Sequence, residues 1–286
     1  MTTNIFLLVL TASLLHALWN FLVRKTSGNL VILWIGIWIA CIFILPGVIV
    51  RSIQTSQPEA SLGLAVACTL ATGIIHAAYF FLLGKAYHLG EISLVYPVAR
   101  GSGVALTALM AWLVLQESFT ALGIGGIVLI CVGILSLSGS VKPSAHNKQP
   151  ILLALAIGVS IVAYSIVDKI GVSVVDPVLY IWFMFLISAL LLTPYVMIRH
   201  RGRIIQEIKG NMKYAIVIGT GSVSTYLMIL FAFRQGPVAY IVAIREIAVV
   251  AGAFLGIVLL KEKVTLLKLV AIVLIVVGTV FIRINP

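Results

Sequence analysis

The chain has 286 residues, of which 62% are hydrophobic and only 9% are charged, and its formal net charge is +11. A mean hydropathy of +1.21 excludes an ordinary soluble globular protein. The apolar residues form long blocks without the alternating polarity of transmembrane strands, so the sequence indicates an all-α membrane protein.

Apolar runs of about 20 residues, long enough to cross a hydrocarbon core of about 30 Å, recur along the whole chain. They predict about ten transmembrane helices, near residues 4–23, 30–50, 62–84, 92–115, 120–138, 151–168, 177–198, 212–233, 238–260 and 264–282. The first run has neither a basic start nor a small-residue cleavage site. We therefore interpret it as a permanent helix and not as a signal peptide.

Similar residues recur along the chain at a fixed offset of 145 positions. The pairs are Arg100 with Arg245, Glu117 with Glu262, Gly133 with Gly278, Trp19 with Tyr164, and Arg24 with Lys169. They predict a first five-helix repeat over residues 1–138, a polar linker over 139–150 and a second repeat over 151–286. Because five is odd, the second repeat enters the bilayer from the opposite face. Two inverted five-helix repeats are typical of secondary transporters.

The basic residues outside the spans are divided unequally between the two faces of the membrane. Four lie on the side of the N-terminus and thirteen on the other, and the connection over residues 199–213 is the strongest contributor. Because basic loops stay in the cytoplasm, this bias predicts that both termini lie outside it.

Of the 27 charged side chains, only three are predicted to lie deep inside an apolar run: Arg100, Arg245 and Glu246. A charge in hydrocarbon costs a few kcal/mol, so such residues mark candidate functional sites. Two arrangements stay open. Both arginines could bind an anionic substrate while Glu246 balances charge or carries a proton. Alternatively, Arg100 pairs with Glu246 as scaffold and leaves Arg245 for the substrate.

Polar and aromatic residues at helical spacing predict a lined cavity near these charges. On the first helix, His16, Trp19 and Asn20 share one face, and His76 and Tyr79 do so on the third. The alternative is that they only hydrogen-bond and pack between helices. The predicted substrate-binding set consists of these five residues together with Tyr96, Tyr226, Arg100 and Arg245.

The fourth predicted helix contains Pro97, followed by Gly101 and Gly103. Proline removes a helix hydrogen bond, so we expect the helix to bend or break there and to expose irregular backbone beside Arg100. By contrast, Glu117 and Glu262 fall at helix ends, where we interpret them as turn residues or caps.

Signatures of enzymes and metal sites are missing from the sequence. It has no Walker-type loop, HExxH, CxxC or GxSxG motif, and its three cysteines are isolated. We therefore predict no enzyme activity, no cofactor and no metal site. The basic residues are scattered through loops, so we also predict no nucleic-acid partner.

Three motifs carry a resemblance to a known family. They are the opening His16-Ala17-Leu18-Trp19-Asn20, the stretch EISLVYPVARG at residues 91–101, and Gln116-Glu117 or Lys261-Glu262 before the last helix of each half. With ten spans in two halves, the chain resembles EamA-type members of the drug/metabolite transporter superfamily. The resemblance implies an inner-membrane exporter or importer of small metabolites, with the third, fourth, eighth and ninth helices around a central cavity.

The subgroup with this opening motif is associated with phosphonate utilisation, which agrees with a site containing two arginines. Many family members are described with cytoplasmic termini, whereas the loop charges here favour the reverse. We predict a secondary transporter in the inner (plasma) membrane that moves a small anionic or zwitterionic metabolite by alternating access. A lipid-carrier flippase and an amino-acid or amine exporter are the alternatives. The expected partners are a small-molecule substrate and the bilayer, with a proton as candidate coupling ion, and the chain would act as a monomer or homodimer.

Overall fold

A computed structural model describes residues 1–54, 62–89, 92–137, 148–260 and 264–284, and these residues form eleven helices. The helices are α1 (Thr3–Lys25), α2 (Leu30–Gln54), α3 (Leu62–Leu89), α4 (Ile92–Leu115), α5 (Ala121–Ser136), α6 (Gln149–Val174), α7 (Pro177–Arg199), α8 (Arg201–Gln235), α9 (Val238–Ile244), α10 (Ile247–Leu260) and α11 (Leu266–Ile284). Within the described ranges, nine segments are long and apolar enough to span a membrane, and α5 is a shorter apolar helix. The predicted all-α membrane architecture is confirmed.

The ninth predicted span is divided into two helices, because α9 ends at Ile244 and α10 begins at Ile247. Arg245 and Glu246 occupy the break. Three amide groups there, those of Glu246, Ala248 and Val249, bond carbonyls three residues back at 2.8–3.1 Å. This tight, 3₁₀-like turn satisfies the backbone, which irregular structure at membrane depth requires. The sequence placed irregular backbone at Pro97 instead, but α4 continues through that proline without interruption.

The connection between the seventh and eighth spans is helical, although the sequence analysis treated residues 199–213 as a basic connection. Helix α8 begins at Arg201 and continues for 35 residues. The side chains of Arg201, Arg203 and Lys209 are exposed, so the first turns of α8 form a charged extension of the spanning helix.

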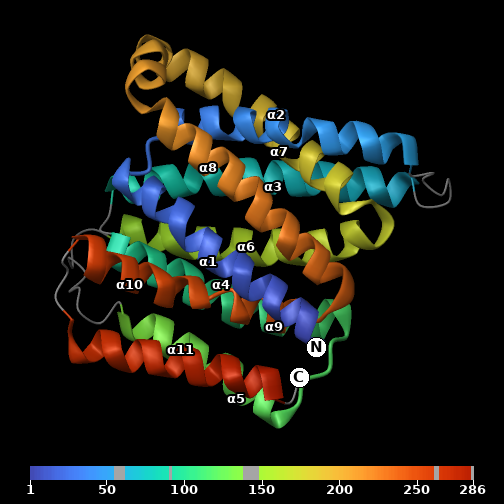
Figure 1. The fold of residues 1–286 in the computed structure, drawn as a ribbon, viewed down its shortest axis with the longest axis vertical. Coiled ribbons are helices and arrows are strands. Elements are labelled where there is room, and N and C mark those ends of the chain that lie inside the picture. Colours follow the sequence, from blue (N-terminus) through green and yellow to red (C-terminus); the bar gives the residue numbers. More distant parts are fainter. Residues whose placement is uncertain (55–61, 90–91, 138–147, 261–263, 285–286) are drawn as a thin grey trace.

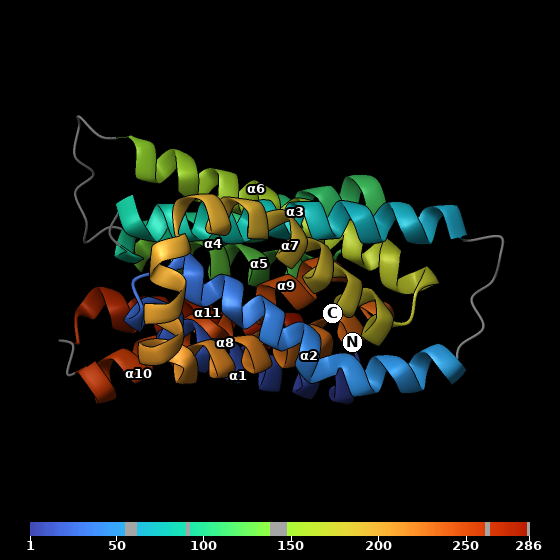
Figure 2. The ribbon, with the colours of Figure 1, turned by 90° about the horizontal axis from the view of Figure 1, so that it is seen from above.

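The helices form layers across the molecule, with the α5–α11 pair at one end and α2 and α7 towards the other (Figure 1; Figure 2 shows the same helices from above). Helix α3 packs against α6 as α1 packs against α8, and α2 packs against α8 as α3 packs against α7. If α1, α2 and α3 correspond to α6, α7 and α8, each of these contacts has its counterpart in the other half. Two related halves would produce such a correspondence, and the repeat itself stays a prediction.

Glycine permits the closest crossing of α5 and α11. A Cβ built on Gly126 would lie 2.6 Å from the carbonyl oxygen of Gly278, and one built on Gly278 would lie 2.6 Å from that of Gly126. The two backbones therefore touch directly, which is typical of helix pairs in membranes, where small residues permit close packing.

We predict that Gly126→Ala lowers the thermal unfolding temperature in detergent, even though alanine ordinarily stabilises a helix by about 1 kcal/mol relative to glycine. The added methyl group must push the helices apart, and such overpacking costs about 1–3 kcal/mol. Gly125→Ala is the matched control, because its Cβ would meet only Phe281, at 3.9 Å. Equal effects of the two substitutions would contradict this account of the crossing.

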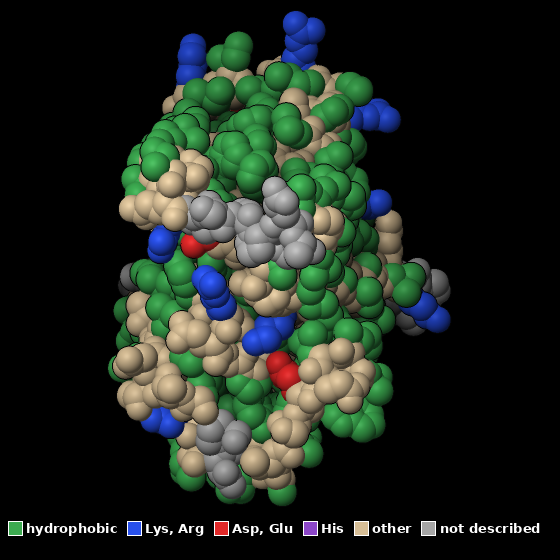
Figure 3. Space-filling view, turned by 90° about the vertical axis from the view of Figure 1, so that its right-hand side faces the viewer, with side chains coloured by type: hydrophobic (Ala, Val, Ile, Leu, Met, Phe, Trp, Pro, Cys, Tyr) green, Lys and Arg blue, Asp and Glu red, His purple; other side chains and the backbone are tan. Residues whose placement is uncertain are grey.

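The two ends of the chain lie on the same side of the molecule. The Arg283 guanidinium donates a hydrogen bond to the Thr3 hydroxyl at 2.8 Å and lies 5.6 Å from the Phe6 ring centroid. An even number of membrane crossings requires this arrangement. Figure 3 shows the face at the right-hand side of Figure 1, where Lys and Arg side chains are scattered among apolar ones.

The orientation predicted from loop charge can be tested by cysteine labelling in intact cells. We expect an impermeant maleimide to label Thr2→Cys and not Gly202→Cys, because the basic start of α8 should stay in the cytoplasm. Permeabilised cells, in which both positions should react, provide the control. The reverse pattern would place both termini in the cytoplasm. Of the native cysteines, Cys41 and Cys68 are buried and Cys131 is partly buried.

Candidate functional site

A buried ion pair joins the middle of α4 to the break between α9 and α10. The Arg100 guanidinium contacts the Glu246 carboxylate through Nη2 at 2.7 Å and through Nε at 3.0 Å. Arg100 is 4% exposed and Glu246 1% exposed. The Nε contact is a hydrogen bond to a charged acceptor, which is stronger than one between neutral groups, and the Nη2 contact is a close ion pair. The pairing of Arg100 with Glu246 that the sequence left open is therefore observed, whereas the role of Arg245 in substrate binding stays a prediction.

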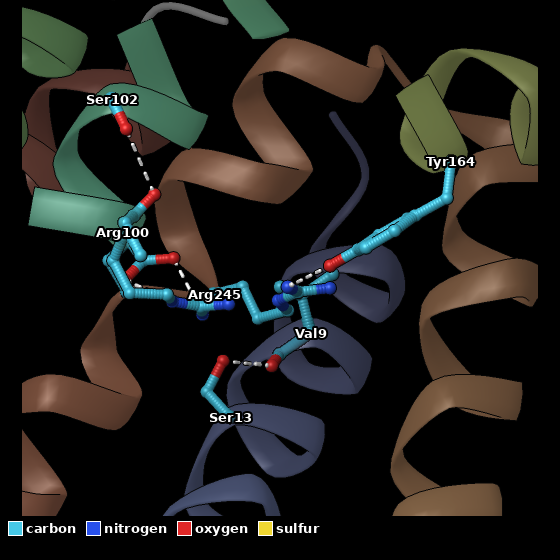
Figure 4. A network of polar contacts seen from close by, with 8 residues as sticks. Val9, Ser13, Arg100, Ser102, Tyr164 and Arg245 are labelled. Carbon is cyan, nitrogen blue, oxygen red and sulfur yellow. Dashed lines mark hydrogen bonds and ion pairs between the residues drawn. The ribbon is translucent and has the colours of Figure 1, made fainter. Parts of the chain in front are cut away.

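The guanidinium of Arg245 has no such partner. It is 3% exposed and donates one hydrogen bond, from Nη2 to the Tyr164 hydroxyl at 3.2 Å (Figure 4). Its Nε is buried without a hydrogen-bond partner, and no carboxylate of the described residues lies within ion-pair distance. Arg245 is thus a buried cation whose charge is not matched by direct contact.

Both arginines border a cavity with two lobes, which share His16 and Tyr79 in their walls. Empty space at the Arg100 lobe amounts to about 300 Å³ and at the Arg245 lobe to about 410 Å³, and both volumes include space that is open to solvent. Helices α1, α3, α4 and α6 form the Arg100 lobe, whereas α1, α3, α6, α7, α8 and the α9–α10 break form the Arg245 lobe.

Every residue of the predicted substrate-binding set lines one of these lobes. The Arg100 lobe has His16, Asn20, Tyr79, Tyr96 and Arg100 in its wall, and the Arg245 lobe has His16, Trp19, His76, Tyr79, Tyr226 and Arg245. Two further predicted residues, Glu246 and Pro97, are not among the lining residues. The structure brings the set together, and the roles of its members stay predictions.

Aromatic contacts hold the wall of the Arg245 lobe. The His76 ring stacks on Tyr164 with centroids 4.4 Å apart and meets Tyr226 edge-on at 5.3 Å. The indole of Trp19 donates to the Thr225 hydroxyl at 3.2 Å, which ties α1 to α8. The lobe therefore combines one cationic end with a wall of fixed rings.

The opposite wall of the Arg245 lobe is apolar and includes Phe80, Met184 and Phe185. The last two come from α7, a helix that the sequence analysis did not place at the cavity. Long apolar helices give little sign of which face borders a cavity, so their contribution had no signal in the sequence.

The sequence analysis missed a fourth deeply buried charged residue, Asp168, which is 0% exposed. It placed the end of the sixth span at residue 168, but α6 continues to Val174, so Asp168 lies well inside the helix. The prediction that only three charged residues lie deep in the chain is therefore wrong. The apolar residues 170–175 after Lys169 were the signal that the span continues.

Two other charged side chains fix the start of α9. The Glu117 carboxylate accepts hydrogen bonds from the backbone amides of Val238 at 2.6 Å and Ala239 at 3.2 Å. The Lys169 ammonium donates to the carbonyl of Gly236 at 3.0 Å, at the end of α8. A carboxylate at a helix N-terminus and a cation at a C-terminus both oppose the helix dipole. The expected capping role of Glu117 is thus observed, whereas Glu262 lies outside the described residues.

A multi-pass helical protein with a polar, charged cavity among its spans has the features of a membrane transport protein. Residues 148–284 match the family described as "EamA-like transporter family". This part of the chain is thus similar to an EamA-like transporter domain, in agreement with the resemblance seen in the sequence, and the matched family is one of transporters and not of enzymes.

Known structures support the same fold over the whole chain. A solved structure entitled "Crystal structure of protein" superimposes with a TM-score of 0.78 at 17% sequence identity, and the match covers 99% of both chains. At this identity the likeness shows the fold alone. No curated protein matches the chain.

We predict that Arg100→Gln destabilises the protein by about 3–5 kcal/mol, because the substitution leaves the Glu246 carboxylate buried without its partner. The double variant Arg100→Gln with Glu246→Gln should recover most of that loss, since no net charge then stays buried. Thermal unfolding of the three proteins in detergent measures both effects. Additive losses in the double variant would show that the pair does not act as a unit.

Proposed function

We propose that this protein is a secondary transporter that moves a small organic anion or zwitterion across the inner membrane by alternating access. The EamA-like family is a family of transporters, and this indicates the general activity, which is membrane transport of a small molecule. The substrate class and the mechanism are our proposal.

The observation that carries the proposal is the unmatched charge of Arg245. A buried guanidinium without a carboxylate is costly in an apolar environment, and its unpartnered Nε lies beside a cavity. An anionic group in the Arg245 lobe would supply both the missing charge and the missing hydrogen-bond acceptor. A planar guanidinium suits carboxylate, phosphate and phosphonate groups, which accept two parallel hydrogen bonds.

The remaining walls favour an organic ligand over a simple inorganic ion. Phe80, Met184 and Phe185 offer an apolar surface, and the rings of His76 and Tyr164 provide stacking faces. In this proposal Arg245 is the anchor and these side chains contact the body of the substrate. Arg100, held by Glu246, shapes the second lobe together with His16, Asn20, Tyr79 and Tyr96.

The charge of the cavity weighs against the amine-exporter alternative. An amine needs an acidic anchor, and the residues that line the two lobes include arginine but neither Asp nor Glu. A lipid-carrier flippase would require an opening between helices towards the bilayer. Such a protein should bind a long polyprenyl phosphate and not small organic anions, and a ligand screen distinguishes the two.

The substrate class can be tested by a thermal-shift screen of the purified protein against phosphonates, organic phosphates, carboxylates, amino acids, amines and a polyprenyl phosphate. A ligand that binds the folded state raises its unfolding temperature. We expect small organic anions to stabilise the protein and simple amines to have no effect. Stabilisation by amines alone, or by the long lipid alone, would overturn the proposal.

We predict that Arg245→Gln weakens binding of the stabilising anion by about 1.5–3 kcal/mol, or about tenfold to a hundredfold, the range of a hydrogen bond to a charged group. Arg245→Lys should recover part of the loss, because it keeps the charge but not the planar fork. Arg234→Gln is the control, since Arg234 is exposed at the end of α8. Equal affinities of Arg245→Gln and Arg234→Gln would remove Arg245 from the site.

A further inference from the structure

Behind the wall of the Arg245 lobe lies a carboxyl group with no cationic partner. Asp168 of α6 is 0% exposed, and no basic side chain of the described residues lies within ion-pair distance of it. Its Oδ1 accepts a hydrogen bond from the Tyr180 hydroxyl of α7 at 2.8 Å, and its Oδ2 accepts one from the Tyr226 hydroxyl of α8. A carboxyl group at membrane depth without a counterion is a functional candidate.

The surroundings of Asp168 can accommodate either protonation state. Two hydroxyl donors stabilise the carboxylate, and a tyrosine hydroxyl can also accept a hydrogen bond from a protonated carboxyl group. The chain makes room for this arrangement at Gly171, one turn later in α6, where a Cβ would overlap the Tyr180 ring. Tyr180 is itself 0% exposed, so the site is closed on the α7 side.

Other polar and titratable groups face Asp168 from the neighbouring helices. Helix α3 contributes Cys68, Thr72 and His76, of which Thr72 also faces the carboxyl group and binds the His76 ring nitrogen at 3.0 Å. The break after α9 contributes Arg245, whose positive charge acts on Asp168. On α6 itself, Lys169 is directed instead to the end of α8. On α4, Tyr96 and Arg100 line the other lobe.

One side chain connects Asp168 directly to the cavity. The Tyr226 hydroxyl bonds to Asp168, while its ring lines the Arg245 lobe and meets Tyr164 edge-on at 5.9 Å. Tyr164 in turn accepts the hydrogen bond from Arg245. Two packed tyrosines therefore lie between Asp168 and the proposed substrate anchor.

The charges of the site indicate how protonation of Asp168 would change the binding of an anion. Arg100 and Glu246 neutralise each other, which leaves Arg245 and Asp168 as the unpaired charges of opposite sign. With Asp168 ionised the two compensate each other across the wall. With Asp168 protonated the lobe has one net positive charge, which favours an anion.

We propose that Asp168 is the proton-binding site of the transporter, and that its protonation and the binding of an anion at Arg245 favour each other. This coupling rests on the proposed function, whereas the titration of Asp168 does not. In a proton-coupled cycle the carboxyl group takes its proton from water on one side with the anion and returns it on the other. Above the pH at which Asp168 ionises, anion affinity should then fall by up to about tenfold per pH unit.

The protonation of Asp168 can be measured without a substrate. The chain contains only two aspartates, Asp168 and Asp176, so labelling aspartate side chains with ¹³C yields two carboxyl signals, which Asp176→Asn assigns. We expect the Asp168 signal of the wild-type protein in lipid to change from protonated to ionised within the pH range in which the protein stays folded. A single protonation state over this range overturns the proposal. So does a transition that follows sodium concentration instead of pH.

The connection to Arg245 is tested by the same signal. In Arg245→Gln, Asp168 should take up its proton at higher pH, because the carboxylate loses a neighbouring positive charge. Arg234→Gln should leave the titration unchanged. An identical titration in both variants would show that Asp168 does not sense the anchor, and would overturn the coupling.

The anion found by thermal shift then provides the transport-related test. We expect the affinity of the wild-type protein and of Asp176→Asn to fall with rising pH, and that of Asp168→Asn to be independent of pH. Retained pH dependence in Asp168→Asn would overturn the proposal even if Arg245→Gln abolishes binding. Conversely, unchanged binding in Arg245→Gln would overturn the proposed function. The titration of Asp168 would then still be decided by its carboxyl signal alone.

Discussion

Charge compensation in a medium without water is the constraint on which the site depends. The ion pair between Arg100 and Glu246 forms where the chain breaks between α9 and α10. Adjacent residues of a continuous helix point about 100° apart, which restricts where two charged neighbours can be directed. The tight turn at the break directs Glu246 towards α4 and Arg245 towards Tyr164, and it keeps the backbone hydrogen-bonded. This irregular turn thus holds Glu246 in a neutral pair with Arg100, and it holds Arg245 as a cation without a carboxylate partner.

The helices around this turn are joined by specific contacts. Glu117 and Lys169 fix the segment that joins α8 to α9, and Trp19 ties α1 to α8. Behind the cavity, Gly126 and Gly278 bring α5 and α11 into backbone contact. A ligand site needs such support, because its polar groups must keep their geometry without water to replace a lost contact.

Much of the fold follows from hydrophobicity and length, because a chain in a bilayer must form apolar helices of nearly fixed size. The approximate positions of the helices, and the location of His16, His76, Arg100 and Arg245 at the two lobes, were predictable on that basis, although α5 is shorter than a full span. The break at Arg245 was not, since it has no proline or glycine to indicate it. At Pro97 the sequence predicted a bend or a break; the helix is continuous there, and the bend stays a prediction. A membrane helix can continue through a proline when neighbouring helices and side chains satisfy the backbone groups that the proline leaves free.

Two further differences have a common cause, which is that the ends of spans are defined weakly by composition. The polar residues at the start of α8 are helical although they are not apolar, and α6 continues past two charged residues. The second of these hid Asp168 at what looked like a membrane boundary. Tertiary contacts, here the hydroxyl groups of Tyr180 and Tyr226, make a charged residue acceptable at a depth that its neighbours in sequence do not reveal.

The cap of α9 also bears on how the two parts of the chain depend on each other. Helix α9 is only seven residues long, and the carboxylate that accepts from its first amides belongs to Glu117, at the end of α4. A helix of this length has little stability of its own. The part of the chain that matches the EamA-like domain therefore has its charged turn positioned by a residue outside that domain. The second half on its own therefore lacks the carboxylate that caps α9.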